Sequence, residues 1–161
     1  MGLFDNLFGK KQQETIKEDN VFQILGLNVD EIPNDKFIKG NSETNTTGQT
    51  YTNFRRFYSD KIFGIFDLVE VKVFEGSKGK NILISSNDNN GNVQNRIKNL
   101  VDKLFLIYGN DQLGCGRFKE EEQEDLEENS WSGRLWTDQK FQYPILLSID
   151  ENCYTLTIWV K

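Results

Sequence analysis

Apolar side chains between residues 93 and 108 recur at spacings of three and four, and this pattern predicts a helix of about four turns. Asn residues before the segment are suited to cap its start, and Gly109 is suited to end it. The apolar positions are Val93, Ile97, Leu100, Val101, Leu104, Phe105 and Tyr108. Burial of such side chains contributes ~1.5–3 kcal/mol each before ordering costs, so we expect this helix to cover a sheet and organise the core.

Elsewhere the apolar residues alternate with polar ones, which predicts strands. Val69, Val71 and Val73 alternate with charged residues, and a Gly-Ser-Lys-Gly turn then leads back through Ile82 and Ile84. This pattern predicts a hairpin.

Two more strand pairs follow from the same reasoning. Residues 36–40 and 50–58 read as strands around a polar loop at 41–49, and residues 145–149 and 154–160 alternate around an Asp-Glu-Asn turn. The sequence therefore predicts an α+β fold, a mainly antiparallel sheet of five to seven strands with one long amphipathic helix packed on one face.

The chain divides into an N-terminal segment with a linker, residues 1–20, and a single α+β domain, residues 21–161, which is long enough to bury its own core. The apolar cluster from Val21 to Leu27 leads into the domain as a short helix or a strand, and its periodicity does not decide between them.

The N-terminal segment begins with large apolar side chains that share one side of a short helix, namely Leu3, Phe4, Leu7 and Phe8. Lys10 and Lys11 follow them, an arrangement that suits a membrane interface. This opening resembles the start of many small bacterial proteins, and Gly-Leu-Phe-Asp resembles the start of some amphipathic membrane-active peptides. We expect either docking on protein, including a homo-oligomer formed through this segment, or weak contact with a membrane surface.

Composition narrows the possible chemistry. With 19 Lys and Arg against 25 Asp and Glu the formal charge is −6, which disfavours nucleic acid as a partner. The absence of His excludes a Ser-His-Asp triad, a Cys-His pair and zinc sites that contain His. There is no secretion signal, the cysteines are too few for a disulfide framework, and the longest apolar run is far short of a membrane span, so we expect a cytoplasmic protein.

Two glycine-containing stretches resemble ligand loops and depart from both patterns. In Glu-Gly-Ser-Lys-Gly-Lys-Asn, Phe74 occupies the position of the first P-loop glycine and Asn81 replaces the hydroxyl that holds Mg²⁺. Residues 87–92 lack the glycine and the final glutamate of a calcium loop. We therefore interpret them as a hairpin turn and a helix cap, and we expect no metal and no cofactor.

Cys115 lies between two glycines near Arg117, and without a His to act as base it is expected to be a loop thiol rather than a nucleophile. Trp131, Arg134 and Trp136 can stack an arginine on an indole ring or pack on the sheet.

Aromatic residues and arginines are interleaved in residues 51–61, as in proteins that bind single-stranded nucleic acid. In a strand, however, these side chains divide between the core and the surface, and we expect no nucleic acid to bind.

The most unusual charged stretch is an acidic run around Leu126. It comprises Glu120, Glu121, Glu122, Glu124, Asp125, Glu127 and Glu128. Such a run is typical of a solvated loop or frayed helix, and it can also steer a basic partner to the surface.

Our leading hypothesis is a non-enzymatic bacterial protein-recognition domain that binds a basic partner through this acidic run, as an immunity protein does. One alternative is a small-ligand binder or carboxylate-based enzyme with a cleft between helix and sheet. Another is a peripheral membrane protein attached through residues 1–11.

Overall fold

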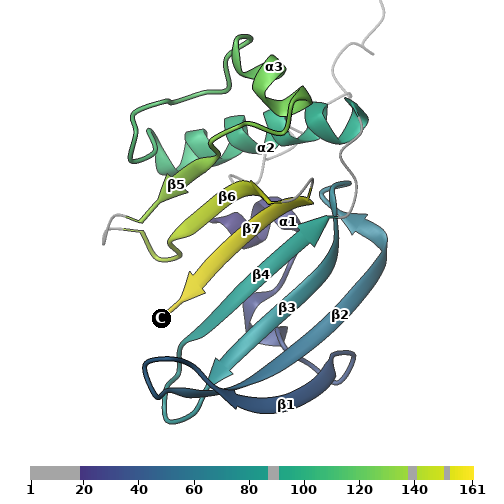
Figure 1. Ribbon diagram of the computed structural model, residues 1–161, viewed down its shortest axis with the longest axis vertical. Helices are drawn as coiled ribbons and strands as arrows, with labels where there is room; N and C mark the ends of the chain where they lie inside the picture. Colours follow the sequence, from purple (N-terminus) through teal and green to yellow (C-terminus); the bar gives the residue numbers. More distant parts are fainter. Residues whose placement is uncertain (1–18, 87–90, 138–140, 151–152) are drawn as a thin grey trace, which may run out of the picture.

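A computed structural model describes residues 19–86, 91–137, 141–150 and 153–161, and the structural statements below concern these residues. They form one sheet with helices against it (Figure 1). In chain order the elements are α1 (Val21–Leu25), the 3-10 helix η1 (Val29–Glu31), β1 (Ile38–Thr44), β2 (Thr50–Ile62), β3 (Phe66–Phe74), β4 (Lys80–Ser86), α2 (Gly91–Tyr108), α3 (Glu122–Glu127), β5 (Arg134–Trp136), β6 (Ile145–Asp150) and β7 (Cys153–Val160).

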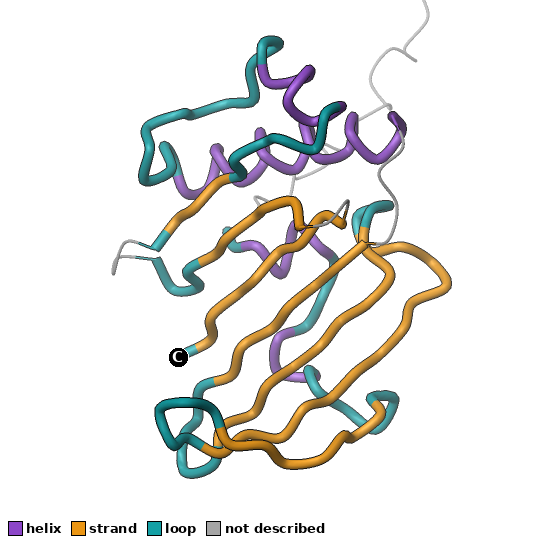
Figure 2. The backbone as a smooth tube through the Cα atoms, viewed as in Figure 1, coloured by secondary structure: helices purple, strands orange, loops and turns teal. Residues whose placement is uncertain are grey.

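The sheet has seven strands in the order β1-β2-β3-β4-β7-β6-β5, and all neighbouring strands are antiparallel. In Figures 1 and 2 the strands twist progressively, α1 and η1 lie behind the sheet, and α2 and α3 lie toward the β5 edge. The predicted fold class is confirmed.

The long helix α2 is confirmed, and its predicted apolar stripe is buried except for Phe105, which is half-buried. Ile97, Leu100 and Leu104 are 0% exposed, whereas Leu106 on the outer side of the helix is 68% exposed. The helix ends at Gly109, whose φ of +73° suits glycine and whose amide donates to the carbonyl of Phe105 at 2.8 Å. The Asn residues that we expected to cap its start fall partly at 87–90, outside the described residues.

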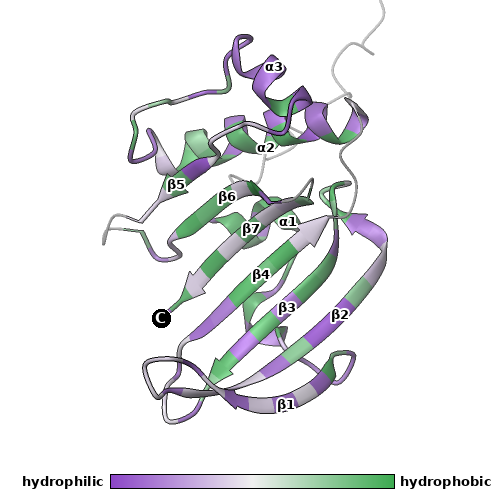
Figure 3. Ribbon diagram, viewed as in Figure 1, coloured by the Kyte–Doolittle hydropathy of each residue, from purple (hydrophilic) through white to green (hydrophobic). Residues whose placement is uncertain are grey.

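The sheet buries one face under the helices. Strand pairing places one row of side chains across six strands of this inner face, with arginine at each end. The row runs through Arg56, Val69, Ile84, Leu156, Leu147 and Arg134. Its apolar members are all 0% exposed and join the cluster that contains the stripe of α2. Figure 3 shows the alternation of apolar and polar residues along β3.

The apolar cluster at residues 21–27 begins with a helix. Asn20 caps α1, because its side chain accepts hydrogen bonds from the amides of Phe22 and Gln23. Gly26 ends α1 in the left-handed conformation at φ +66°. These end signals settle what five residues of periodicity left open.

Strand β1 is longer than its sequence pattern predicts. Residues 41–44, which we expected in the loop, continue β1 along the edge of the sheet. Hydroxyl pairs join this stretch to β2, with Ser42 2.9 Å from Thr52 and Thr44 3.2 Å from Thr50. Every residue of β1 is exposed, so its strand structure leaves no apolar alternation to detect.

Candidate functional site on the open face of the sheet

The face of the sheet opposite the helices is open, because no described element covers it (Figure 1). Since strand residues alternate between faces, the register that builds the core places a second row of side chains outside. This row crosses all seven strands through Ile38, Arg55, Glu70, Leu83, Thr157, Leu146 and Leu135. We call this surface the open face.

Two of the most exposed apolar side chains of the described residues lie on the open face. Ile38 is 69% exposed and pairs with Arg55, and Phe57 is 68% exposed and pairs with Leu68. They come from neighbouring strands, β1 and β2. The exposed side chains give this end of the open face an apolar surface without a partner in the described fold.

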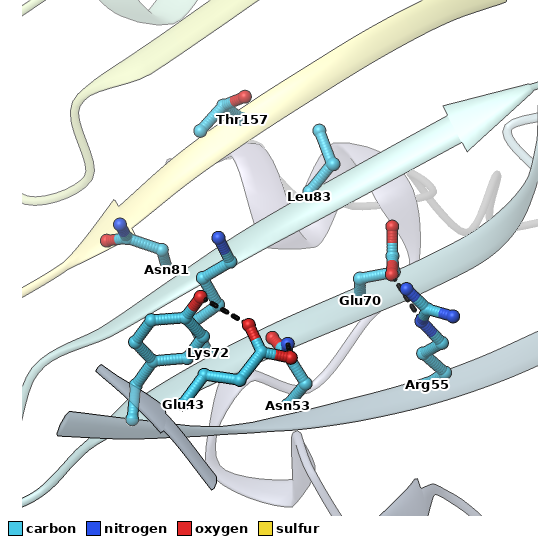
Figure 4. Close-up of a pocket in the computed structure, with 9 residues that line it drawn as sticks. Glu43, Asn53, Arg55, Glu70, Lys72, Asn81, Leu83 and Thr157 are labelled. Carbon is cyan, nitrogen blue, oxygen red and sulfur yellow. Dashed lines mark hydrogen bonds and ion pairs between the residues drawn. The ribbon is translucent and has the colours of Figure 1, made fainter. Parts of the chain in front are cut away.

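A hollow of about 420 Å³ lies on the open face beside these apolar residues (Figure 4). Its walls come from β1, β2, β3, β4 and β7. The charged and polar side chains that line it are Glu43, Tyr51, Asn53, Arg55, Glu70, Lys72, Asn81 and Thr157. The hollow therefore gathers both signs of charge from strands that are distant in sequence.

Glu43 is held by neighbours on β2. The hydroxyl of Tyr51 donates to Oε2 of Glu43 at 2.8 Å, and the side-chain amide of Asn53 donates to Oε1 at 3.5 Å. The hydrogen bond to Glu43 raises the pKa of Tyr51 above its ordinary value. Both carboxylate oxygens of Glu43 thus have donors from the protein itself.

Glu70 forms an ion pair with Arg55, which lies directly opposite it on β2. Nε of Arg55 donates to Oε1 of Glu70 at 2.5 Å (Figure 4). The Arg55 side chain is 61% exposed, and its two terminal amino groups have no hydrogen-bond partner among the described residues. Exposed ion pairs contribute about 0.2–1 kcal/mol, so this pair shapes the hollow more than it stabilises the fold.

Lys72 stands beside Tyr51, and its Nζ lies 4.8 Å from the centroid of the Tyr51 ring. Within the described ranges, no carboxylate forms an ion pair with this ammonium group. The charged groups of the hollow that keep unused donors are therefore the ammonium of Lys72 and the outer guanidinium edge of Arg55.

The acidic run folds as the short helix α3 and its flanks rather than as a loop. Leu126 on its inner side is 0% exposed. Glu122 is half-buried, and the other acids of the run are exposed, namely Glu120, Glu121, Glu124, Asp125, Glu127 and Glu128. The run that we predicted as one partner-binding surface thus divides into one structural residue and an exposed remainder.

Glu122 belongs to a charged cluster beneath α3. Its Oε1 accepts hydrogen bonds from Nη2 of Arg134 and from the indole nitrogen of Trp131. Partial burial acts to raise the pKa of Glu122, but the hydrogen bonds from Arg134, the Lys119 amide and Trp131 outweigh it and hold that pKa below its ordinary value.

Arg134 also meets Asp111, from the loop that follows α2. Its Nε lies 3.4 Å from Oδ2 of Asp111, close enough for an ion pair, while neither atom makes a hydrogen bond within the described part of the chain. The two side chains are 1% and 0% exposed. The guanidinium carbon lies 5.4 Å from the Trp131 ring, so the arginine–indole contact that the sequence allowed is present.

Cys115 lies half-buried in the same loop, and its amide donates to Oδ1 of Asp111 at 2.8 Å. Arg117, which we considered as an activating group, lies with its guanidinium carbon 5.3 Å from the ring of Phe105. Among the residues that the structure describes, no hydrogen bond or ion pair joins a general base to this thiol.

The N-terminal residues Leu3, Phe4, Leu7 and Phe8 lie outside the described residues, so their docking on protein or membrane stays a prediction. None of the described helices has the length and apolar composition needed to cross a lipid bilayer.

The cleft that we considered between helix and sheet stays a prediction. Ile97 and Leu104 from α2 are fully buried there, and the hollow of about 420 Å³ lies on the opposite face. The sequence did not point to this hollow. Glu43 lies in the stretch that the sequence predicts to be a loop, and Lys72 is one of many charged residues that alternate with apolar ones along the strands. The available signal was the alternation that puts Glu70 and Lys72 opposite the valines.

Comparisons of the chain with protein-family models, with curated proteins and with solved structures found no match. The functional argument accordingly proceeds from the site itself.

Proposed function

We propose that this domain recognises a partner protein across the open face of its sheet. One observation carries the proposal: Ile38 and Phe57, 69% and 68% exposed, lie on the face that also holds the hollow with its free donors. A surface that joins exposed apolar groups to a few oriented polar groups has the composition of a recognition site.

The chemistry of the open face defines the partner. Ile38 and Phe57 favour an apolar counterpart, and burial of each can contribute about 1.5–3 kcal/mol. Lys72 and the outer edge of Arg55 favour acidic side chains beside it, because opposite charges orient an approaching partner. We therefore propose a partner whose contact surface combines apolar and acidic residues.

Replacement of exposed apolar residues by serine, on the open face and elsewhere on the surface, tests this proposal. The chain and its variants are used to retain proteins from the native host, the retained protein is identified, and the variants are compared for that same protein. The double variant Ile38→Ser and Phe57→Ser should lose it. The matched control, Leu106→Ser with Leu113→Ser, changes side chains that are 68% and 74% exposed elsewhere and should keep it.

Equal retention by both double variants contradicts the proposal, as does a native chain that retains no specific protein. Loss only in the control variant would move the interface to the side of α2 that carries Leu106.

A second candidate function is capture of a basic partner by the exposed acids of residues 120–128. The observation that favours it is that Leu126 and Glu122 fix α3 from beneath, which leaves the other carboxylates directed to solvent. Lys119 is 3.6 Å from Glu121, and both are exposed, so this pair does little to neutralise the surface. A dense negative surface accelerates association with a positive one.

A further inference from the structure

We infer that the hollow on the open face binds the carboxylate of an acidic side chain, presented by an extended segment with an apolar residue two positions before it and another two positions after it. This inference rests on the proposed function and names the chemistry of the same face.

The free hydrogen-bonding groups of the hollow decide the sign of the ligand. Both oxygens of Glu43 accept hydrogen bonds from the protein, and Glu70 accepts one from Arg55. Lys72 lies against the Tyr51 ring and forms no ion pair with a described carboxylate, and Arg55 donates from Nε to Glu70. Oε2 of Glu70 keeps its acceptor capacity, but among the described residues Lys72 has no ion pair and the two terminal amino groups of Arg55 have no hydrogen-bond partner, so we infer that an anion gains more from this site than a cation does.

The positions of the donors suit one carboxylate. Lys72 pairs with Asn53, and Arg55 pairs with Glu70, so the two cations are diagonal neighbours on adjacent strands. Diagonal neighbours lie ~7–8 Å apart at the backbone, a distance within the reach of long side chains. A carboxylate offers about four acceptor positions and can take donors from both cations together.

The carboxylates already present disfavour a more highly charged ligand. Glu43 and Glu70 line the same hollow, so a phosphate dianion meets stronger repulsion than a single carboxylate does. The apolar residues beside the hollow also favour a peptide over a free phosphate. In the row of side chains that crosses the open face, Leu83 follows Glu70 and Ile38 precedes Arg55.

The spacing of these neighbours defines the sequence pattern. Ile38 on β1 and Leu83 on β4 are separated by two strands, so they lie three interstrand steps apart, or ~14 Å. An extended chain rises ~3.3 Å per residue, and residues i, i+2 and i+4 share one side of it. Apolar side chains at i and i+4 therefore span ~13 Å with the acid between them, which matches the row.

The test is a nuclear magnetic resonance titration of the isotope-labelled full chain with the terminally blocked peptide Leu-Thr-Glu-Thr-Leu. We expect the resonances of Lys72, Arg55 and Asn81 in the labelled chain to shift when the peptide is added. The Gln counterpart should bind about tenfold more weakly, the value of one lost charge-assisted contact.

Two lysine variants locate the effect. Lys72→Gln should abolish the preference for the Glu peptide over the Gln peptide. Lys39→Gln should retain this preference, because Lys39 is exposed on β1 but pairs with Phe54, which faces the core, and so lies on the opposite side of the sheet from the hollow. An unchanged melting temperature in both variants establishes that the fold is intact.

Equal binding of the two peptides, no binding of either, or a preference that survives Lys72→Gln would overturn the inference. Inorganic phosphate that shifts the same resonances more strongly than the Glu peptide would overturn it in favour of a phosphate site. These results are separable from the proposed function, which stands or falls on the Ile38 and Phe57 variants with the partner protein.

Discussion

The carboxylate of Glu122 accepts a hydrogen bond from Nη2 of Arg134, an arginine whose side chain is only 1% exposed. One residue of an apparently solvated acidic run is thus bound to a cation inside the domain. The contact joins α3 to strand β5, and Asp111 brings the loop after α2 to the same guanidinium. This cluster holds α3, which carries exposed acids, against the edge strand β5.

Loss of the buried cation should destabilise the domain strongly. Arg134→Met leaves Asp111 without its ion-pair partner in the interior, and we expect the free energy of unfolding to fall by about 3–5 kcal/mol. Urea unfolding measures the change. Arg55→Met is the matched control, because Arg55 is 61% exposed and its pair with Glu70 should contribute less than about 1 kcal/mol. Similar losses in both variants would contradict the assignment.

The same cluster predicts a dependence of stability on pH. Because the pKa of Glu122 is held below its ordinary 4.5, its contribution is complete above about pH 4.5 and is lost as the pH falls through the lowered folded-state value. Glu122→Gln should be less stable than the native chain at neutral pH, and the difference should shrink in acid. Unfolding free energies at about pH 7 and about pH 3 test this, and a constant difference would exclude the effect.

The second candidate function predicts a dependence on salt. Glu124→Gln with Glu128→Gln removes two exposed charges from the acidic surface, and it should slow association with a basic partner and weaken the effect of ionic strength. Asp60→Asn with Glu75→Gln removes the same charge from exposed sites elsewhere. Stopped-flow association rates across a salt series distinguish the two pairs, and identical salt slopes would reject the acidic surface as the docking site.

The elements that carry a clear period were predictable from the sequence. Ile97 and Leu104 lie on the buried stripe of α2 as their spacing predicts, and Val69 and Val71 face the core as their alternation predicts. Burial against water imposes these periods, so they can be recognised without knowledge of the partner element.

The features that depend on register could not be predicted in the same way. Arg55 lies opposite Glu70, and Lys72 approaches Tyr51, only because β2 and β3 pair with one particular alignment. Glu122 has the same chemistry as its acidic neighbours, and only the fold brings it to Arg134. Contacts between segments that are distant in sequence carry the candidate site, and local pattern does not specify them.

The dissociation constant of the purified partner protein for the native chain and for Phe57→Ser tests recognition through the open face most directly. Removal of this 68% exposed ring should weaken binding by at least about tenfold, as expected for an apolar anchor at an interface, while Leu113→Ser should leave the constant unchanged. Equal dissociation constants for the native chain and Phe57→Ser, or a loss confined to Leu113→Ser, would contradict the account.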